Sequence, residues 1–216
     1  MRSCDLDSDS IPWATPTRLE GNRVALVPLS EEHAKDLADA SADGNLSALW
    51  YTTVPAPQNM LSAIQSRLRL AQSGSWIPYA AVDPRTNHAV GMTSFLHIVP
   101  SVRRLEIGGT WFRASAQRTG INIESKFLLL RQAFEQFKCI AVELRTNRFN
   151  QQSRRAIESL GARLDGVLRN HYDAFGKPRD TCVYSIISDE WSQVKDHLMW
   201  RLARYPLPKI AYMNVR

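Results

Sequence analysis

The sequence lacks the features that would mark a secreted, metal-binding or membrane protein. Its three cysteines, Cys4, Cys139 and Cys182, show no C-x-x-C spacing and no histidine-rich partner, so we expect neither a disulfide framework nor a metal site. No apolar run approaches the roughly 20 residues that span a bilayer. Residues 1–17 carry acids and prolines where a signal peptide carries a basic and then an apolar segment. These absences predict a soluble, cytoplasmic protein without a membrane partner.

Charge of one sign is also scarce. The 27 Lys and Arg exceed the 21 Asp and Glu by only six, and no basic run is longer than two residues. Such an excess favours an anionic ligand, but it is too small to predict direct contact with DNA. The densest basic spots are the pairs Arg103-Arg104 and Arg154-Arg155, for which a solvated surface is the usual role.

The length and composition predict one domain. A chain of 216 residues that is 44% apolar can bury one substantial core and is short for two. Residues 1–18 show no core pattern and are expected to form an arm, residues 19–204 the domain, and residues 205–216 an apolar tail.

Periodicity predicts an alternation of strands and helices in that domain. Strands are expected at residues 23–29, 78–82, 90–98, 105–112, 140–146, 163–172 and 181–187. Helices are expected at residues 31–43 and 58–74, from near Ile123, from Asn150 to Leu160, and after Ser188 as an N-cap.

The most informative stretch is residues 117–122, which join the strand at 105–112 to the helix that opens near Ile123. A glycine beside accessible N–H groups, at the positive end of a helix, forms a cradle for a diphosphate. The helix then presents an apolar face that packs on a sheet. That face consists of Ile123, Phe127, Leu130, Phe134 and Phe137.

Together with this loop, several other motifs resemble the GNAT superfamily of acyl-CoA-dependent N-acyltransferases, specifically its RimJ/RimL-like branch of ribosomal-protein N-terminal acetyltransferases. The resemblance covers roughly residues 19–191. The motifs are Glu106-Ile107-Gly108 before Trp111, Glu143-Leu144-Arg145-Thr146-Asn147, Asn150 followed by Ser153, Leu160-Gly161-Ala162, Arg179-Asp180-Thr181, Tyr184-Ser185 and Glu190-Trp191. Asn122 stands where the superfamily loop usually ends in Gly or Ala.

The resemblance implies a mixed α/β (α+β) GNAT fold, with a central, mostly antiparallel sheet of about seven strands flanked by helices. It implies transfer of an acetyl group from acetyl-CoA directly to a primary amine, a protein N-terminus or a small amine, within a ternary complex. It also implies a homodimer. The residues it nominates for acetyl-CoA are Trp111, Phe112, Gln117, Arg118, Thr119, Gly120, Ile121, Asn122, Asn147, Asn150 and Arg154.

Acetyl transfer needs a proton acceptor for the amine and a proton donor for the leaving thiolate. Glu106 is the first candidate for the acceptor, acting directly or through water, because strand alternation places it on the face of Thr110. It could equally be a solvated strand carboxylate, and Glu143 and Asp180 are weaker candidates. For the donor the resemblance nominates Ser153.

Several readings stay open at this point. Asn150 would hold the pantetheine amides, or it would only cap its helix and bond Ser153. Gly108-Gly109 indicates either a bulge or a merely weakened strand. The chain could also be a non-catalytic acyl-CoA sensor, or a basic module that binds RNA or a ribosome surface through its arginine pairs.

Overall fold

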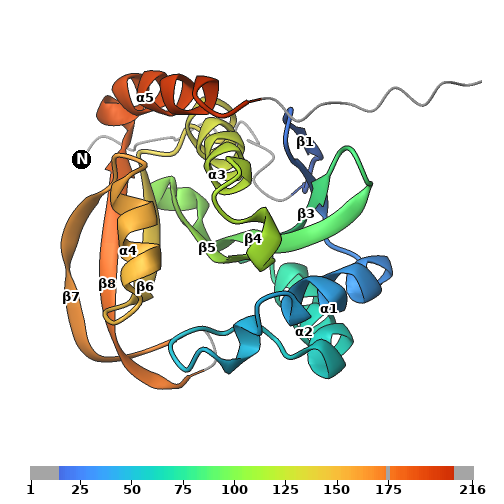
Figure 1. The fold of residues 1–216 in the computed structure, drawn as a ribbon. Helices are drawn as coiled ribbons and strands as arrows, with labels where there is room; N and C mark the ends of the chain where they lie inside the picture. The colour runs from blue at the N-terminus through green and yellow to red at the C-terminus, as the bar shows by residue number, and fades with distance from the viewer. Residues whose placement is uncertain (1–14, 174–175, 207–216) are drawn as a thin grey trace, which may run out of the picture.

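A computed structural model of the chain describes residues 15–173 and 176–206. Most of the predicted arm and tail, together with Cys4 and part of the expected turn at residues 175–178, lie outside the described residues. The domain boundaries therefore stay predictions. The figures show the described part as a sheet with helices on both faces (Figure 1).

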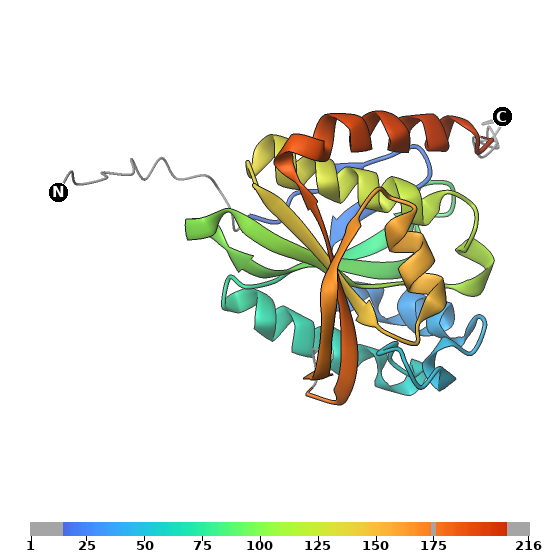
Figure 2. The ribbon, with the colours of Figure 1, turned by 90° about the vertical axis from the view of Figure 1, so that its left-hand side faces the viewer.

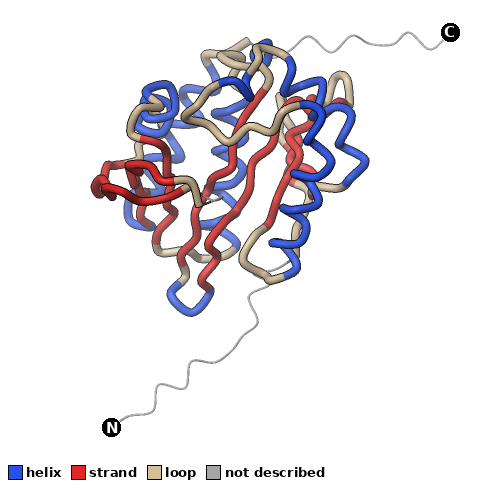
Figure 3. Tube along the Cα trace, turned by 90° about the horizontal axis from the view of Figure 1, so that it is seen from below, coloured by secondary structure: helices blue, strands red, loops and turns tan. Residues whose placement is uncertain are grey.

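The sheet has eight strands in the order β1-β2-β3-β4-β5-β6-β8-β7. Every neighbouring pair is antiparallel except β5 and β6, which are parallel, so the predicted mixed and mostly antiparallel sheet is confirmed. Seen from below, the strands cross the molecule as a twisted fan (Figure 3). The strands are β1 Leu19–Glu20, β2 Ala25–Pro28, β3 Ile77–Asp83, β4 His88–Val99, β5 Arg104–Phe112, β6 Ala141–Asn147, β7 Arg163–Tyr172 and β8 Pro178–Ile187. The eighth strand is the short β1, which precedes the predicted first strand.

Helices cover both faces of the sheet. α1 (Ala34–Ala42) and α2 (Met60–Gln72) lie below it in Figure 1, while α3 (Ile121–Arg131) and α5 (Trp191–Ala203) lie above it. α5 runs across the top of α3 in the turned view (Figure 2). The shorter α4 (Gln151–Glu158) lies beside β6. Short 3₁₀ turns occupy Glu31–His33, Leu46–Ala48, Pro57–Asn59, Pro100–Val102, Ala114–Ala116 and Ser188–Glu190.

Two apolar cores fill the space between the sheet and these helices. The larger one joins the sheet to α3, α4 and α5, and the smaller one joins it to α1 and α2 through Leu37, Ile64 and Met92. The two described cysteines, Cys139 and Cys182, are buried free thiols, as expected of small core side chains. Within the described residues, none of the helices combines enough length with enough hydropathy to cross a bilayer.

α3 begins two residues earlier than predicted. Gly120 takes the N-cap position with a φ of 92°, in the left-handed region that glycine adopts without strain. Ile121 and Asn122 therefore belong to the first helical turn and not to the loop. The helix continues into a π-helical turn at Gln132–Gln136. Its predicted apolar face is confirmed, with Phe127 only partly buried.

The last helix starts later than predicted. Ser188 does not cap α5, because it lies inside a 3₁₀ turn and its N–H donates to the carbonyl of Ile140 at 2.9 Å. α5 begins at Trp191, and the predicted stripe of Trp191, Val194 and Leu198 is buried. Tyr205, the first residue of the predicted tail, packs partly buried against the same core.

Candidate active site

The site forms where two neighbouring strands separate. β5 and β6 pair only from Arg104 opposite Ala141 to Glu106 opposite Glu143. Beyond that point β5 stays paired with β4, and β6 stays paired with β8 as far as Asn147. A cavity of about 540 Å³ opens between the diverging strands, and α3, α4 and β7 complete its walls. This divergence leaves main-chain groups of β5 without partners on β6.

A bulge in β5 determines which side chains enter the cavity from each face. β4 pairs Met92 with Trp111 and Ser94 with Gly108, so Gly109 and Thr110 together oppose the single residue Thr93. Gly109 has a φ of 59°, which favours glycine. Thr110 and Thr93 lie on the same face, with their hydroxyl oxygens 2.8 Å apart.

The bulge that the Gly108-Gly109 pair suggested is therefore present. The expectation that Glu106 and Thr110 share a face is wrong, because the extra residue reverses the alternation between them. Thr110 faces α3, whereas Glu106 shares the face of Gly108 and of Trp111, which packs with α1 and α2.

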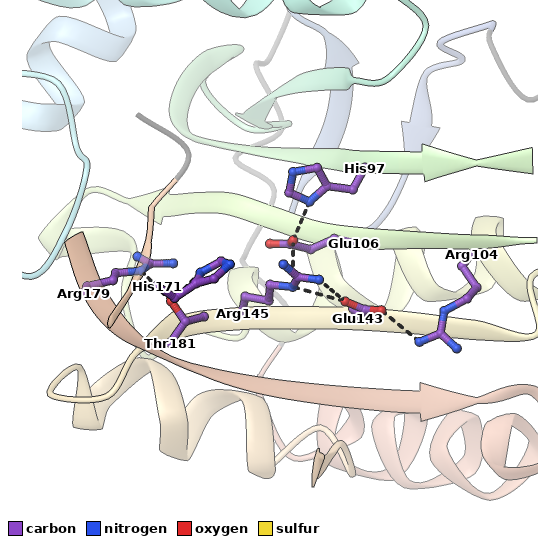
Figure 4. Close-up of polar contacts among 8 residues, drawn as sticks. All are labelled: His97, Arg104, Glu106, Glu143, Arg145, His171, Arg179 and Thr181. Atoms are coloured by element: carbon purple, nitrogen blue, oxygen red, sulfur yellow. Dashed lines mark hydrogen bonds and ion pairs between the residues drawn. The ribbon is translucent and has the colours of Figure 1, made fainter. Parts of the chain in front are cut away.

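Glu106 belongs to a chain of charged side chains (Figure 4). Its Oε2 lies 2.9 Å from Nδ1 of His97 and 3.5 Å from Nε of Arg145. Arg145 also donates to Glu143 at 2.7 Å, and Glu143 accepts from Arg104 at 2.8 Å. Glu106 is only 6% exposed, and its hydrogen bond raises the pKa of His97. Although burial opposes ionisation, the two arginines hold the pKa of Glu143 below its usual range.

The hairpin β7–β8 supplies polar groups on another side of the cavity. Nε of Arg179 donates to the hydroxyl of Thr181 at 3.0 Å, and Nδ1 of His171 lies 3.3 Å from the same oxygen. Burial lowers the pKa of Arg179. The rings of His171 and Tyr172 stack with their centroids 4.4 Å apart. Figure 4 shows Arg179 and His171 together at the opposite end from Arg104.

Lys126 enters the cavity from α3 and was missed by the sequence reasoning. The residue is 5% exposed, and its Nζ donates to the hydroxyl of Thr110 at 2.6 Å. Burial lowers the lysine pKa to about 7, although the negative charge of Glu106 acts to raise it. A signal existed in the sequence, because Lys126 lies three residues after Ile123 and four before Leu130, on the side of the helix that packs on the sheet.

The N-terminus of α3 forms the other end of the cavity. Gln117, Arg118, Gly120 and Asn122 line it. The side-chain amide of Gln117 donates to the carbonyl of Phe112 at 3.1 Å and accepts from Gln152 at 3.0 Å, which fixes the loop.

The remaining residues of the predicted loop face elsewhere. Thr119 and Ile121 line a neighbouring hollow, and the Thr119 hydroxyl donates to the carbonyl of Ala116 at 2.6 Å. The first N–H groups of a helix have no acceptor within that helix, so the start of α3 can bind an anion.

The structure brings some of the remaining predicted residues to the cavity and leaves two outside its lining. Trp111, Phe112, Asn150 and Ser153 line it. Oδ1 of Asn150 accepts the N–H of Ser153 at 3.0 Å, so the capping role of Asn150 is confirmed.

Asn147 and Arg154 are the two of these remaining residues that lie outside the lining of the cavity. Asn147 is buried and accepts the N–H of Phe149 at 2.9 Å. Arg154 donates from Nε to the Tyr184 hydroxyl at 3.0 Å.

Known proteins share this fold. The family model "Acetyltransferase (GNAT) domain" matches residues 23–163. A GCN5-related N-acetyltransferase from Brucella melitensis is 25% identical, with a TM-score of 0.77, over 88% of this chain and 87% of that one. A structure described as an acetyltransferase from T. thermophilus is 30% identical, with a TM-score of 0.76, over 88% and 99%. Mycobacterium smegmatis RimJ shares the fold at 18% identity, with a TM-score of 0.73 over 88% and 97%. No curated protein sequence matches the chain.

Proposed function

The chain belongs to the GNAT acetyltransferase family of acetyl-CoA-dependent acyltransferases, and we propose that it transfers the acetyl group directly to a primary amine while both substrates are bound. The observation that carries this proposal is the cavity of about 540 Å³ between β5 and β6. It is lined at one end by the start of α3 and elsewhere by Glu106. One ligand can therefore place its anionic end at the helix and its reactive end beside a carboxylate.

The start of α3 would hold the diphosphate of acetyl-CoA. The free N–H groups and the helix dipole favour an anion there, and Arg118 lines the same end of the cavity. The pantetheine arm is extended and carries amides, so it can pair with the open edge of β5 as an added strand would. Its path would run past Phe112 and Trp111 toward the bulge at Gly109, with Asn150 on the facing wall.

Transfer then needs a neutral amine beside the thioester carbon. Glu106 would accept the proton of the amine, and His97, which is hydrogen-bonded to it, offers a route for that proton to solvent because its side chain is 57% exposed. The hydroxyl of Ser153 would hydrogen-bond the sulfur as it leaves. By family resemblance no acyl-enzyme forms.

The acceptor is proposed to be a protein N-terminus or a small amine. An α-amino group has a pKa near about 8, whereas a lysine has one near about 10.4. The α-amino group therefore loses its proton more readily and can be deprotonated by a weaker base. Aromatic and polar side chains line this part of the cavity, including Tyr51, Trp76 and Tyr172. We also propose a homodimer, which light scattering on the purified protein would test.

The test is thiol release from acetyl-CoA over a panel of amines that includes peptides with free and with blocked N-termini. Glu106→Gln should lower turnover by about a hundredfold while CoA affinity is kept. Glu143→Gln is a matched control, because it removes a carboxylate of the same network that does not line the cavity. Equal turnover in wild type and Glu106→Gln would remove Glu106 from the mechanism.

Two other functions are outcomes of the same measurements. A sensor would bind CoA and release no thiol with any amine. An RNA- or ribosome-binding module would show an affinity that falls steeply with salt. The arginine pairs give that module little support, since Arg104 bonds Glu143 and Arg154 bonds Tyr184 within the fold.

A further inference from the structure

Lys126 is a buried lysine that the transfer proposed above leaves without a role. Its Nζ donates to a neutral hydroxyl, that of Thr110, at 2.6 Å, and the residue is 5% exposed. It forms no ion pair with any carboxylate of the described residues. Keeping a lysine in such a place costs stability, because burial disfavours its charged form. Met or Leu at this helix position would fill the space without that cost.

The position of Lys126 relative to β5 indicates what the lysine contacts. Thr110 is the second residue of the bulge and turns its hydroxyl toward α3. Gly108, Gly109, Thr110 and Lys126 all line the same cavity. The diphosphate site lies at the start of α3 and the base lies at Glu106, so the thioester must pass the segment of β5 between them. That segment contains the bulge.

The proton-accepting group and the proton-donating group lie on opposite sides of the bulge. Glu106 and His97 meet on the face toward α1 and α2, whereas Lys126 approaches from α3 on the other face. An amine that enters beside Glu106 attacks the thioester carbon from one side of the sheet. A thioester lying along this segment of β5 would then have its sulfur within reach of Lys126, which lines the same cavity.

We propose that Lys126, as an ammonium, is the catalytic acid that protonates the sulfur of CoA as it leaves, a role that rests on the acetyl transfer proposed above. The amine nitrogen forms its bond to the carbonyl carbon, and the carbon–sulfur bond breaks with its electron pair on sulfur. Nζ of Lys126 gives a proton to that sulfur and becomes neutral. The proton lost by the amine goes to Glu106 and through His97 to solvent, from which Lys126 is protonated again.

The acidities of the groups favour this assignment. The pKa of Lys126 is about 7, and a free thiol has one near about 8.5, so the proton moves downhill from Lys126 to the thiolate. Serine ionises at far higher pH than a thiol, so Ser153 can offer sulfur a hydrogen bond but no net proton. The titratable groups around Lys126 are Glu106 across the bulge and His97 beyond it, while its direct contact, Thr110, is neutral.

The test compares Lys126→Met, Lys126→Arg and the surface control Lys195→Met. Affinity for desulfo-CoA, which lacks the sulfur, reports whether the cavity is intact. Thiol release from acetyl-CoA with the best amine of the panel reports the chemistry. We expect desulfo-CoA affinity to stay within about twofold in all three. Turnover should fall about a hundredfold in Lys126→Met and in Lys126→Arg, because arginine keeps the charge but does not release its proton.

The pH profile gives a readout that a structural role would not change. Wild-type turnover should decline as pH rises past the pKa of Lys126, and this limb should vanish in both Lys126 variants, while the contribution of His97 persists. Wild-type turnover in Lys126→Met, or its restoration in Lys126→Arg, would overturn the assignment. A wild-type protein that binds no CoA, or that releases no thiol with any amine, would overturn the proposed function and this inference with it.

Discussion

The buried amine of Lys126 should make the stability of the fold depend on pH in a way that the Lys126→Met variant lacks. The pKa of this lysine is about 7 in the folded chain, against 10.5 for an ordinary lysine. Between these values the unfolded chain binds a proton that the folded chain does not. The free energy of unfolding therefore falls by about 1.4 kcal/mol for each unit that the pH decreases in this window.

The full cost of the buried charge is reached below about pH 7 and amounts to roughly 5 kcal/mol, the product of the pKa difference and 1.36 kcal/mol per unit. Over the practical range from about pH 9 to about pH 6, wild type should lose roughly 3 kcal/mol relative to Lys126→Met. At the acidic end Lys126→Met should be the more stable protein. Solvent screening is small, because the residue is 5% exposed.

Urea unfolding of both proteins across this pH range measures the difference directly, and subtraction cancels groups that titrate alike in the two chains. Lys195→Met is the control, since Lys195 lies at the surface in an ion pair with Glu135 and should show no such divergence. A wild-type and a Lys126→Met curve that run parallel from the alkaline to the acidic end would refute the reasoning. The amine would then be charged in both the folded and the unfolded state throughout this range.

Three further substitutions test single contacts of the fold and of the site. Gly91→Ala should lower the free energy of unfolding by about 2 kcal/mol or more, because a Cβ there would overlap the carbonyl oxygen of Trp111; an unchanged melting temperature would contradict this. Asn150→Ala should lose about 1 kcal/mol, the usual value of an N-cap, since it leaves the Ser153 N–H without its acceptor; full wild-type stability by urea unfolding would show that water replaces the cap. Ser153→Ala should slow thiol release without abolishing it, and an unchanged rate would remove the hydroxyl from the mechanism.

The fold and the loop of the site could be predicted because their signals are local. Gly120 is the residue that the start of α3 requires, and Asn150 is a preferred cap for α4. Each signal lies within a few residues of the structure that it determines. The element order, the apolar face of α3 and the hairpin β7–β8 follow from similar short-range patterns.

The chemistry of the site was harder to predict because its contacts connect distant residues. Glu106 meets His97 nine residues earlier and Arg145 on β6, which is reached only through the parallel pairing across α3. The face of the sheet on which Thr110 lies depends on one extra residue in β5. A prediction that assumes strict alternation of side chains cannot include this residue. Lys126 was missed because an amphipathic helix is recognised in a sequence by the spacing of its apolar residues. A lysine on the buried face does not contribute to that pattern.

The separation of β5 from β6 and the bulge at Gly109 together give the proposed site two sides. If β5 continued to pair with β6 past Glu106, its main-chain groups would be occupied and no arm could lie along it. If the bulge were absent, alternation would return Thr110 to the face of Glu106, and Lys126 would lose the hydroxyl that holds it. A proton acceptor and a proton donor can then stand on opposite sides of one thioester. The direct transfer proposed above would use this placement, since the amine loses a proton to Glu106 and the sulfur gains one from Lys126 within a single bound complex.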